Sequence, residues 1–170
     1  MTILRPPSLS LLDKYHGRDA QTLYSATVTV TGGDAGHGRA SGLARSDDGN
    51  LDVHLRLPKE LGGPGGGTNP EQLFAAGYAA CFHGALSLLA ARAGIPIPGS
   101  SVEVTVDFNR DPMDGLFVLA ARTRIRLPGV ERAIAEELTR NTERFCPYTK
   151  MARQGITNIV ALAPSDDGGP

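Results

Sequence analysis

Two residues of this chain are the best suited to covalent chemistry, and both are cysteines, Cys81 and Cys146. A thiolate is a nucleophile and a redox centre, and in a reducing compartment two isolated cysteines are more often free, catalytic or redox-active than joined in a permanent bridge. The pattern alone also allows an inert Cys81, because free cysteine is among the residue types most often buried for packing. Reactive and structural roles both remain open at this point.

Metal and phosphate chemistry have little support in the sequence. The two cysteines form no CxxC motif, and the four histidines lie far apart without ligand spacing, so we predict no metal site and no cofactor. The glycine-rich run LGGPGGG has no Lys-Ser/Thr after it and does not match a P-loop. The four histidines are His16, His37, His54 and His83.

The composition predicts one domain without a global electrostatic partner. Its 17 Lys and Arg against 18 Asp and Glu leave a net charge of -1, so no field attracts nucleic acid or an anionic membrane. We see no convincing signal peptide and no apolar run that approaches membrane-spanning length, so we expect a cytoplasmic protein. We expect an arm over 1–21, a domain over 22–163 and a flexible tail over 164–170.

Cys81 lies in the middle of a predicted helix. The helix is expected to begin with Asn69 as N-cap, Pro70 at the first position and Glu71 in the first turn, and to stop at Gly94. The segment between these ends is apolar on nearly all sides, which is typical of a central, buried helix. Small residues on both sides of Cys81 would let another backbone or a ligand approach closely.

Cys146 follows a second predicted helix over 129–145. It precedes Pro147 at the entry to a short helical turn, CPYTKMARQG, where the positive end of the helix dipole favours a thiolate. Two helices in one domain should be neighbours. If their cysteine-bearing parts face each other, a Cα separation of about 5 to 6 Å would permit a disulfide.

Alternating and turn patterns predict the strands around these helices. The order is β-β-β-α-β-β-α-β, which indicates an α+β domain with helices on antiparallel sheets. A tight hairpin is expected at 47–50 because its Asp-Gly-Asn residues tolerate positive φ. The predicted strands cover residues 24–31, 39–46, 50–57, 102–108, 116–127 and 156–162.

A cysteine that attacks a peroxide needs thiolate character, a polar partner and an apolar pocket. Arg39 could supply the charge and Glu71 could hold it, although a solvated loop cation and a dipole-favouring acid are equally simple readings. Because Glu71 and Cys81 are ten positions apart on one helix, about 15 Å along its axis, they can share a site only if a second copy contributes. The proposed pocket residues are Phe74, Tyr78 and Phe82.

Four sequence blocks resemble the organic hydroperoxide resistance proteins of the Ohr/OsmC superfamily. They are LYSATVTVTGG at 23–33, the run from SDDGNLDVHLRLPKELGG to TNPEQLFAAGYAACFHGAL at 46–86, FCPYTKMARQGI at 145–156, and the hairpin and helix between the last two. The resemblance covers about residues 22–163. It implies an intertwined homodimer with antiparallel sheets wrapped around central helices, and a redox-active disulfide used against organic hydroperoxides in the oxidative stress response.

The resemblance also implies roles for individual residues. Cys81 matches the peroxidatic cysteine, Cys146 the resolving cysteine and Glu71 the acidic partner, and a lipoylated protein or another dithiol would reduce the disulfide. Family members usually carry the catalytic arginine directly after TGG, where this chain has Asp34. Arg39 is the natural substitute and Arg45 its competitor.

Three other functions compete with this interpretation. A peroxidase of the OsmC type would have a broader peroxide preference, and the PKELGG and CPY blocks argue against it. A thiol redox sensor would need a partner-binding module, which we do not find in the sequence. A non-enzymatic binding protein with inert cysteines would leave peroxide consumption unchanged when Cys81 is replaced.

Overall fold

The computed structural model describes residues 9–34 and 40–164, and its centre is helix α1 (Pro70–Arg92). The predicted start is confirmed: Asn69 caps the helix by accepting a hydrogen bond from the Gln72 amide at 2.9 Å. Pro70 occupies the first position, where its missing N–H costs nothing. The helix ends before Gly94, which takes the left-handed conformation with φ 67° that stops a helix.

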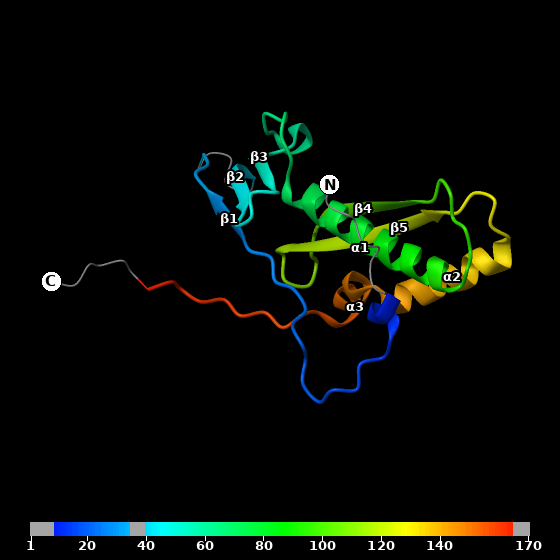
Figure 1. Cartoon of the computed structure of the whole chain (residues 1–170). Helices are drawn as coiled ribbons and strands as arrows, with labels where there is room; N and C mark the ends of the chain where they lie inside the picture. The colour runs from blue at the N-terminus through cyan, green and yellow to red at the C-terminus, as the bar shows by residue number, and fades with distance from the viewer. Residues whose placement is uncertain (1–8, 35–39, 165–170) are drawn as a thin grey trace, which may run out of the picture.

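A long hairpin covers one side of α1 (Figure 1). Strands β4 (Ser101–Arg110) and β5 (Phe117–Arg126) pair antiparallel over their full length. Along β4 the exposed and half-buried residues alternate, as expected for a strand with one covered face. The covered face packs against the helix through Val102, Val104 and Ile125.

A second sheet lies at the N-terminal end of α1 (Figure 1). It is antiparallel, in the order β1 (Val28–Thr31), β2 (Ser41–Ser46), β3 (Asp52–Arg56). The predicted β2–β3 hairpin is confirmed, with Gly49 at φ 73° in its turn. Strand β1 is shorter than the predicted 24–31.

Two helices follow the hairpin: α2 (Arg132–Phe145), as predicted, and α3 (Pro147–Gln154), which extends the expected helical turn. Both contact α1. Two short 3-10 segments complete the described elements. They are η1 (Leu9–Leu12), which touches α1, and η3 (Lys59–Leu61), which leads into the glycine-rich loop.

The predicted strand at 156–162 is wrong for the single chain, where these residues form no strand. Figure 1 shows the segment running away from the body. Ile159, Val160 and Leu162 are 86%, 88% and 99% exposed, so the apolar pattern has no surface of this chain to pack on. A strand forms only beside another strand edge, and in this structure residues 156–162 pair with no strand. The α+β class with antiparallel sheets is otherwise confirmed.

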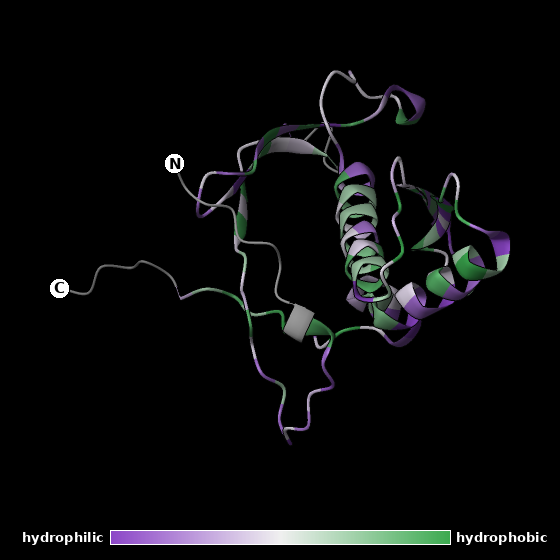
Figure 2. Cartoon of the chain, turned by 45° about the vertical axis from the view of Figure 1, so that its right-hand side comes forward, coloured by the Kyte–Doolittle hydropathy of each residue, from purple (hydrophilic) through white to green (hydrophobic). Residues whose placement is uncertain are grey.

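The expectation that no apolar run approaches membrane-spanning length is also corrected. Among the described residues, α1 has the length and composition to cross a bilayer. Figure 2 shows it apolar along most of its length, whereas α2 has a polar and an apolar side. A central helix has the same composition, and α1 packs against β4 and α2.

Candidate active site around two thiols

Helices α1 and α3 bring the two cysteines together. The Sγ atoms of Cys81 and Cys146 are 3.6 Å apart, and both thiols are free. Cys146 is the residue between α2 and α3 and is completely buried, whereas Cys81 is half-buried. A disulfide requires a sulfur separation of about 2.05 Å, so a small approach of the two side chains would form it.

An apolar cluster surrounds the thiols. Tyr78, Phe82 and Ala85 of α1 are buried with Cys146, and side chains of β4 and β5 close the cluster from the sheet. Since Cys146 has no exposed surface, a reagent from solution meets Cys81 first. The arrangement suits a first reaction at Cys81 followed by transfer to Cys146.

The surroundings disfavour a thiolate at Cys81. Burial, and after it contact with the Cys146 thiol, raises the pKa of Cys81 to about 11. A backbone hydrogen bond from Tyr148 lowers the pKa but does not cancel the effect of burial. A nucleophilic Cys81 therefore requires a cation in addition to the groups that α1 and α3 supply.

Two residues beside the thiols were not singled out from the sequence, Tyr148 and Thr149. The Tyr148 ring lies 5.7 Å from the Tyr78 ring between centroids. The Tyr78 hydroxyl donates to Thr149 Oγ1 at 3.2 Å within the buried core. Helical spacing was the available signal, because Thr149 follows Cys146 by three positions, as Cys81 follows Tyr78.

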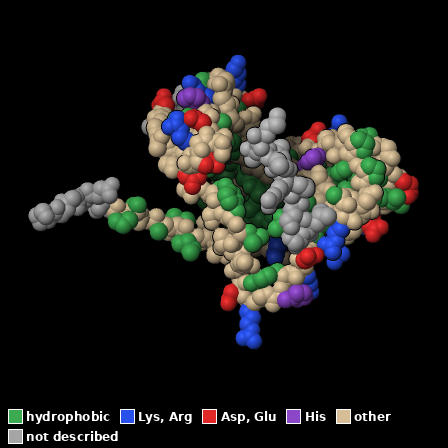
Figure 3. All heavy atoms as spheres, in the orientation of Figure 1, with side chains coloured by type: hydrophobic (Ala, Val, Ile, Leu, Met, Phe, Trp, Pro, Cys, Tyr) green, Lys and Arg blue, Asp and Glu red, His purple; other side chains and the backbone are tan. Residues whose placement is uncertain are grey.

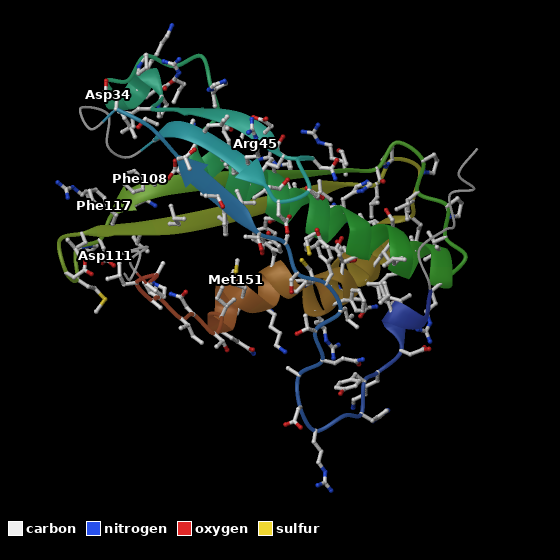
Figure 4. All side chains as sticks on the ribbon, turned by 60° about the vertical axis from the view of Figure 1, so that its left-hand side comes forward. Asp34, Arg45, Phe108, Asp111, Phe117 and Met151 are labelled. Atoms are coloured by element: carbon white, nitrogen blue, oxygen red, sulfur yellow. The ribbon has the colours of Figure 1, made fainter. Side chains whose placement is uncertain are left out.

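Glu71 lies in the first turn of α1, ten positions before Cys81. It lines a cleft of about 260 Å³ whose other walls come from Pro70 and the turn end of the β4–β5 hairpin. There the rings of Phe108 and Phe117 stack at 4.7 Å, and the Arg110 guanidinium lies 4.7 Å from the Phe117 ring centroid. Figure 4 shows the two phenylalanines together at this end. Along the helix axis the cleft is about 15 Å from Cys81.

The two candidate arginines differ in what the structure describes. Arg39 lies outside the described residues. Arg45 stands on β2, where its Nη2 and Nε atoms donate to the Asp52 carboxylate on β3 at 2.7 and 3.0 Å. Figure 4 shows Arg45 apart from the phenylalanine pair. The structure thus shows Arg45 in a cross-strand ion pair.

The predicted pocket residues differ in how deeply they are buried. Tyr78 and Phe82 are 7% and 3% exposed and belong to the core, while Phe74 is half-buried and packs edge-on against Tyr78. His83 is exposed, with Nε2 3.3 Å from Ser100 Oγ. The cleft beside Glu71 is lined by other apolar side chains, among them Phe108, Phe117 and Leu119, and not by Tyr78 or Phe82.

Part of the apolar surface of this chain is uncovered. One side of α1 exposes the small residues Ala76, Ala80 and Gly84. Figure 3 shows apolar side chains in the hollow between the β1–β3 sheet and the rest of the molecule. Exposed apolar surface of this kind marks a contact with another surface.

Comparisons with known proteins agree with this fold. The family model described as OsmC-like protein matches residues 63–160. An organic hydroperoxide resistance protein of Xanthomonas axonopodis pv. citri is 42% identical over 145 residues, covering 84% of this chain and 96% of the relative. The crystal structure of the organic hydroperoxide resistance protein OhrB of Bacillus subtilis has a TM-score of 0.67 at 41% identity, covering 78% of this chain and 93% of that one.

A solved organic hydroperoxide resistance protein of Legionella pneumophila is similar to the same extent. Its TM-score is 0.70 at 36% identity, with 79% of this chain and 93% of that chain covered. Sequence, family model and fold thus agree over most of the length. The chain belongs to the OsmC-like family, among the organic hydroperoxide resistance proteins.

Proposed function

We propose that this protein is a two-cysteine thiol peroxidase that reduces organic hydroperoxides to alcohols. The observation that carries the proposal is the 3.6 Å contact between a half-buried and a fully buried free thiol. Its relatives of similar length are named organic hydroperoxide resistance proteins, which supports the substrate class. The cycle uses Cys81 as the attacking thiol and Cys146 as the resolving one.

The chemistry balances with these two residues and one external dithiol. The Cys81 thiolate attacks the distal peroxide oxygen, an S–O bond forms, the O–O bond breaks, and the alkoxide leaves and takes up a proton as the alcohol. Cys81 is then a sulfenic acid. The Cys146 sulfur attacks it, a disulfide forms and water leaves. A dithiol reduces the disulfide by two exchange steps and is itself oxidised to a disulfide.

The first step depends on stabilising the thiolate. Because burial raises the pKa of Cys81 to about 11, only a small fraction is ionised at neutral pH without a nearby cation. We assign this cation to Arg39, held by Glu71, as the family resemblance implies. The ion pair of Arg45 with Asp52 supports the choice of Arg39 over Arg45.

The site requires a second copy of the chain. Glu71 stands about 15 Å from Cys81 of its own helix and cannot reach it. The uncovered side of α1 and the exposed 156–162 segment provide apolar surface for a homodimer. In a two-fold dimer of antiparallel α1 helices, Glu71 of each copy approaches Cys81 of the other.

The hairpin cleft next to Glu71 then faces the thiol of the second copy. Its phenylalanine pair and Leu119 form an apolar wall suited to the organic part of a hydroperoxide. Hydrogen peroxide has no such part and gains nothing from this wall. The arrangement favours bulky organic hydroperoxides over hydrogen peroxide.

The remaining assignments concern the reductant and the surroundings. We assign re-reduction to dihydrolipoyl groups of a lipoylated protein and the reaction to the cytoplasm, both from the family resemblance and the reducing conditions that free thiols need. The catalytic unit is the 22–163 domain. The 1–21 arm and the 164–170 tail stand outside it.

The test is peroxide removal by the purified protein with dihydrolipoamide. Wild type is compared with Cys81→Ser on cumene hydroperoxide and on hydrogen peroxide. We expect wild type to prefer cumene hydroperoxide and Cys81→Ser to lose turnover with both. A wild type that consumes neither peroxide would sink the proposal, and equal rates on the two would favour the broader OsmC-type activity.

A further inference from the structure

The thiol contact and one hydrogen bond join α1 to the start of α3, beside the packing of the Tyr148 ring. Tyr78 and Cys81 are three positions apart on α1, and Cys146 and Thr149 are three positions apart on the other side. Residues with this spacing share one face of a helix. The Tyr78–Thr149 hydrogen bond at 3.2 Å therefore lies one turn along from the thiol contact at 3.6 Å. We call the Tyr78–Thr149 hydrogen bond the polar rung. Together with the Cys81–Cys146 contact, it links the two helices.

The polar rung lies in the core. Tyr78 is 7% exposed and Thr149 5%, and the bond joins residues 71 positions apart in sequence. Away from water, a hydroxyl that loses its partner finds no replacement, so the bond holds one geometry strongly. It restrains the first turn of α3, which contains the amide of Tyr148 that is hydrogen-bonded to Cys81.

Helix α3 is held on two sides. Toward α2, the Cys146 amide donates to the Thr142 carbonyl at 2.8 Å, and Arg153 pairs with Glu143. Toward α1, the Tyr148 ring lies so close that a Cβ built on Gly77 would stand 2.8 Å from its hydroxyl oxygen, which explains the glycine. The placement of Cys146 against α1 thus depends on the contacts that the first turn of α3 makes with that helix.

We propose that Tyr78 and Thr149 are positioning residues whose hydrogen bond sets how readily Cys81 and Cys146 form a disulfide. Intramolecular bond formation depends on the effective concentration of one group at the other. With the rung intact, the orientation of Cys146 is fixed before reaction. Without it, Cys146 samples orientations in which the sulfur atoms are too far apart. The inference rests on the proposed function in taking this disulfide as a step of the cycle.

The experiment measures the disulfide equilibrium directly, without peroxide. Full-length protein is equilibrated in reduced and oxidised dithiothreitol mixtures, and the fraction of Cys81–Cys146 disulfide is determined by thiol alkylation and mass spectrometry. Tyr78→Phe and Thr149→Val remove one hydroxyl each and keep the side-chain shape. We expect each to lower the equilibrium constant about tenfold, a rise in reduction potential of about 30 mV for this two-electron couple. Thr149→Ser keeps the hydroxyl and restores the wild-type value.

Thr139→Val is the matched control. Thr139 is half-buried, and its hydroxyl donates to the Ala135 carbonyl within α2 at 2.8 Å, so the variant loses a side-chain hydrogen bond about two turns before Cys146. We expect its disulfide equilibrium to stay within about twofold of wild type. The proposal is overturned if Thr139→Val shows the same loss as Thr149→Val, or if the folded rung variants match wild type. Substitutions on both sides of the bond keep the test decisive when one variant fails to fold.

A kinetic measurement separates this inference from the proposed function. After one equivalent of cumene hydroperoxide, a sulfenic acid trap should capture a larger share of the oxidised Cys81 in Thr149→Val than in wild type. If wild type never reacts with peroxide, the proposed function fails and the dithiothreitol equilibrium still decides the role of the rung. Equal trapping in wild type and Thr149→Val counts against the positioning role.

Discussion

The middle and the beginning of α1 differ in how complete their surroundings are within one chain. Around Cys81 the helix is enclosed by α3 and the sheet, the Cys146 thiol is 3.6 Å away, and the core continues on both sides. Around Glu71 the helix borders an open cleft at the end of the hairpin. The thiol pair is thus assembled by folding alone, whereas in the proposed cycle the peroxide-binding side uses a second subunit.

This difference separates the two halves of the proposed reaction. One half depends on contacts within one subunit, and the other depends on the assembly of two subunits. Disulfide formation depends on contacts within one subunit, since both thiols belong to it. Thiolate stabilisation and substrate binding depend on assembly, because Cys81 has a raised pKa and Glu71 lies out of reach. Variants that affect only one level should separate the two halves.

Cys146→Ser removes the resolving thiol, leaves the cleft beside Glu71 unchanged, and should have the largest effect. The first oxidation of Cys81 by cumene hydroperoxide should keep its wild-type rate, because Cys146 takes no part in O–O cleavage. Turnover with dihydrolipoamide should fall about 100-fold, since the sulfenic acid has no resolving thiol and goes on to sulfinic acid. Intact mass after stepwise peroxide addition records both products. Wild-type turnover in this variant would show that Cys146 is dispensable.

Ala76→Glu tests whether the exposed side of α1 forms the interface of the proposed dimer. Ala76 is exposed on the uncovered side of α1, and a carboxylate there would be buried unpaired in a dimer. We expect a monomer by analytical ultracentrifugation and about 30-fold slower oxidation of Cys81, with an unchanged disulfide equilibrium. Ala133→Glu, on the exposed surface of α2, is the control and should behave as wild type. A monomeric Ala76→Glu protein with full activity would contradict the shared site.

The sequence predicts well those structural features that neighbouring residues determine. The start of α1 depends on Asn69 capping Gln72 with Pro70 between them, so a four-residue pattern was sufficient. The same holds for the β2–β3 turn at Gly49. In contrast, a strand at 156–162 requires an edge that no local pattern supplies, and the alternation there is the same whether or not an edge exists.

The candidate site shows the same difference between features set by neighbouring residues and features that depend on distant contacts. The two cysteines were recognised from residue type and sequence blocks, but their contact spans 65 positions and depends on how α1 and α3 pack. The Tyr78–Thr149 bond was missed because any tyrosine and threonine on core helices satisfy the same pattern. The raised pKa of Cys81 follows from burial, which sequence spacing does not measure.

Arg39→Ala tests whether the cation comes from the loop after β1. With the pKa of Cys81 at about 11, the thiolate fraction rises tenfold per pH unit below that value, so the variant's oxidation rate should rise about tenfold per unit from pH 8 to pH 10. Wild type should level off at lower pH, because the cation lowers the pKa of Cys81, and should be the faster protein at pH 7.5. Stopped-flow thiol oxidation measures both profiles. Arg45→Ala, which breaks only the Asp52 pair, should follow wild type, and a steep profile in that variant alone would transfer the role to Arg45.

Phe117→Ala alters the wall of the open cleft and should have the smallest effect. The ring lines the cleft beside Glu71 and stacks on Phe108, so its loss removes apolar contact with the organic part of the substrate. We expect kcat/KM for cumene hydroperoxide to fall about fivefold, a cost of about 1 kcal/mol, while that for hydrogen peroxide is unchanged. Leu116→Ala is the control, since Leu116 is 61% exposed at the hairpin tip and does not line the cleft. An equal loss with both peroxides would mean that the cleft supports the fold of the hairpin and not substrate choice, because a peroxide without an organic part has no contact there to lose.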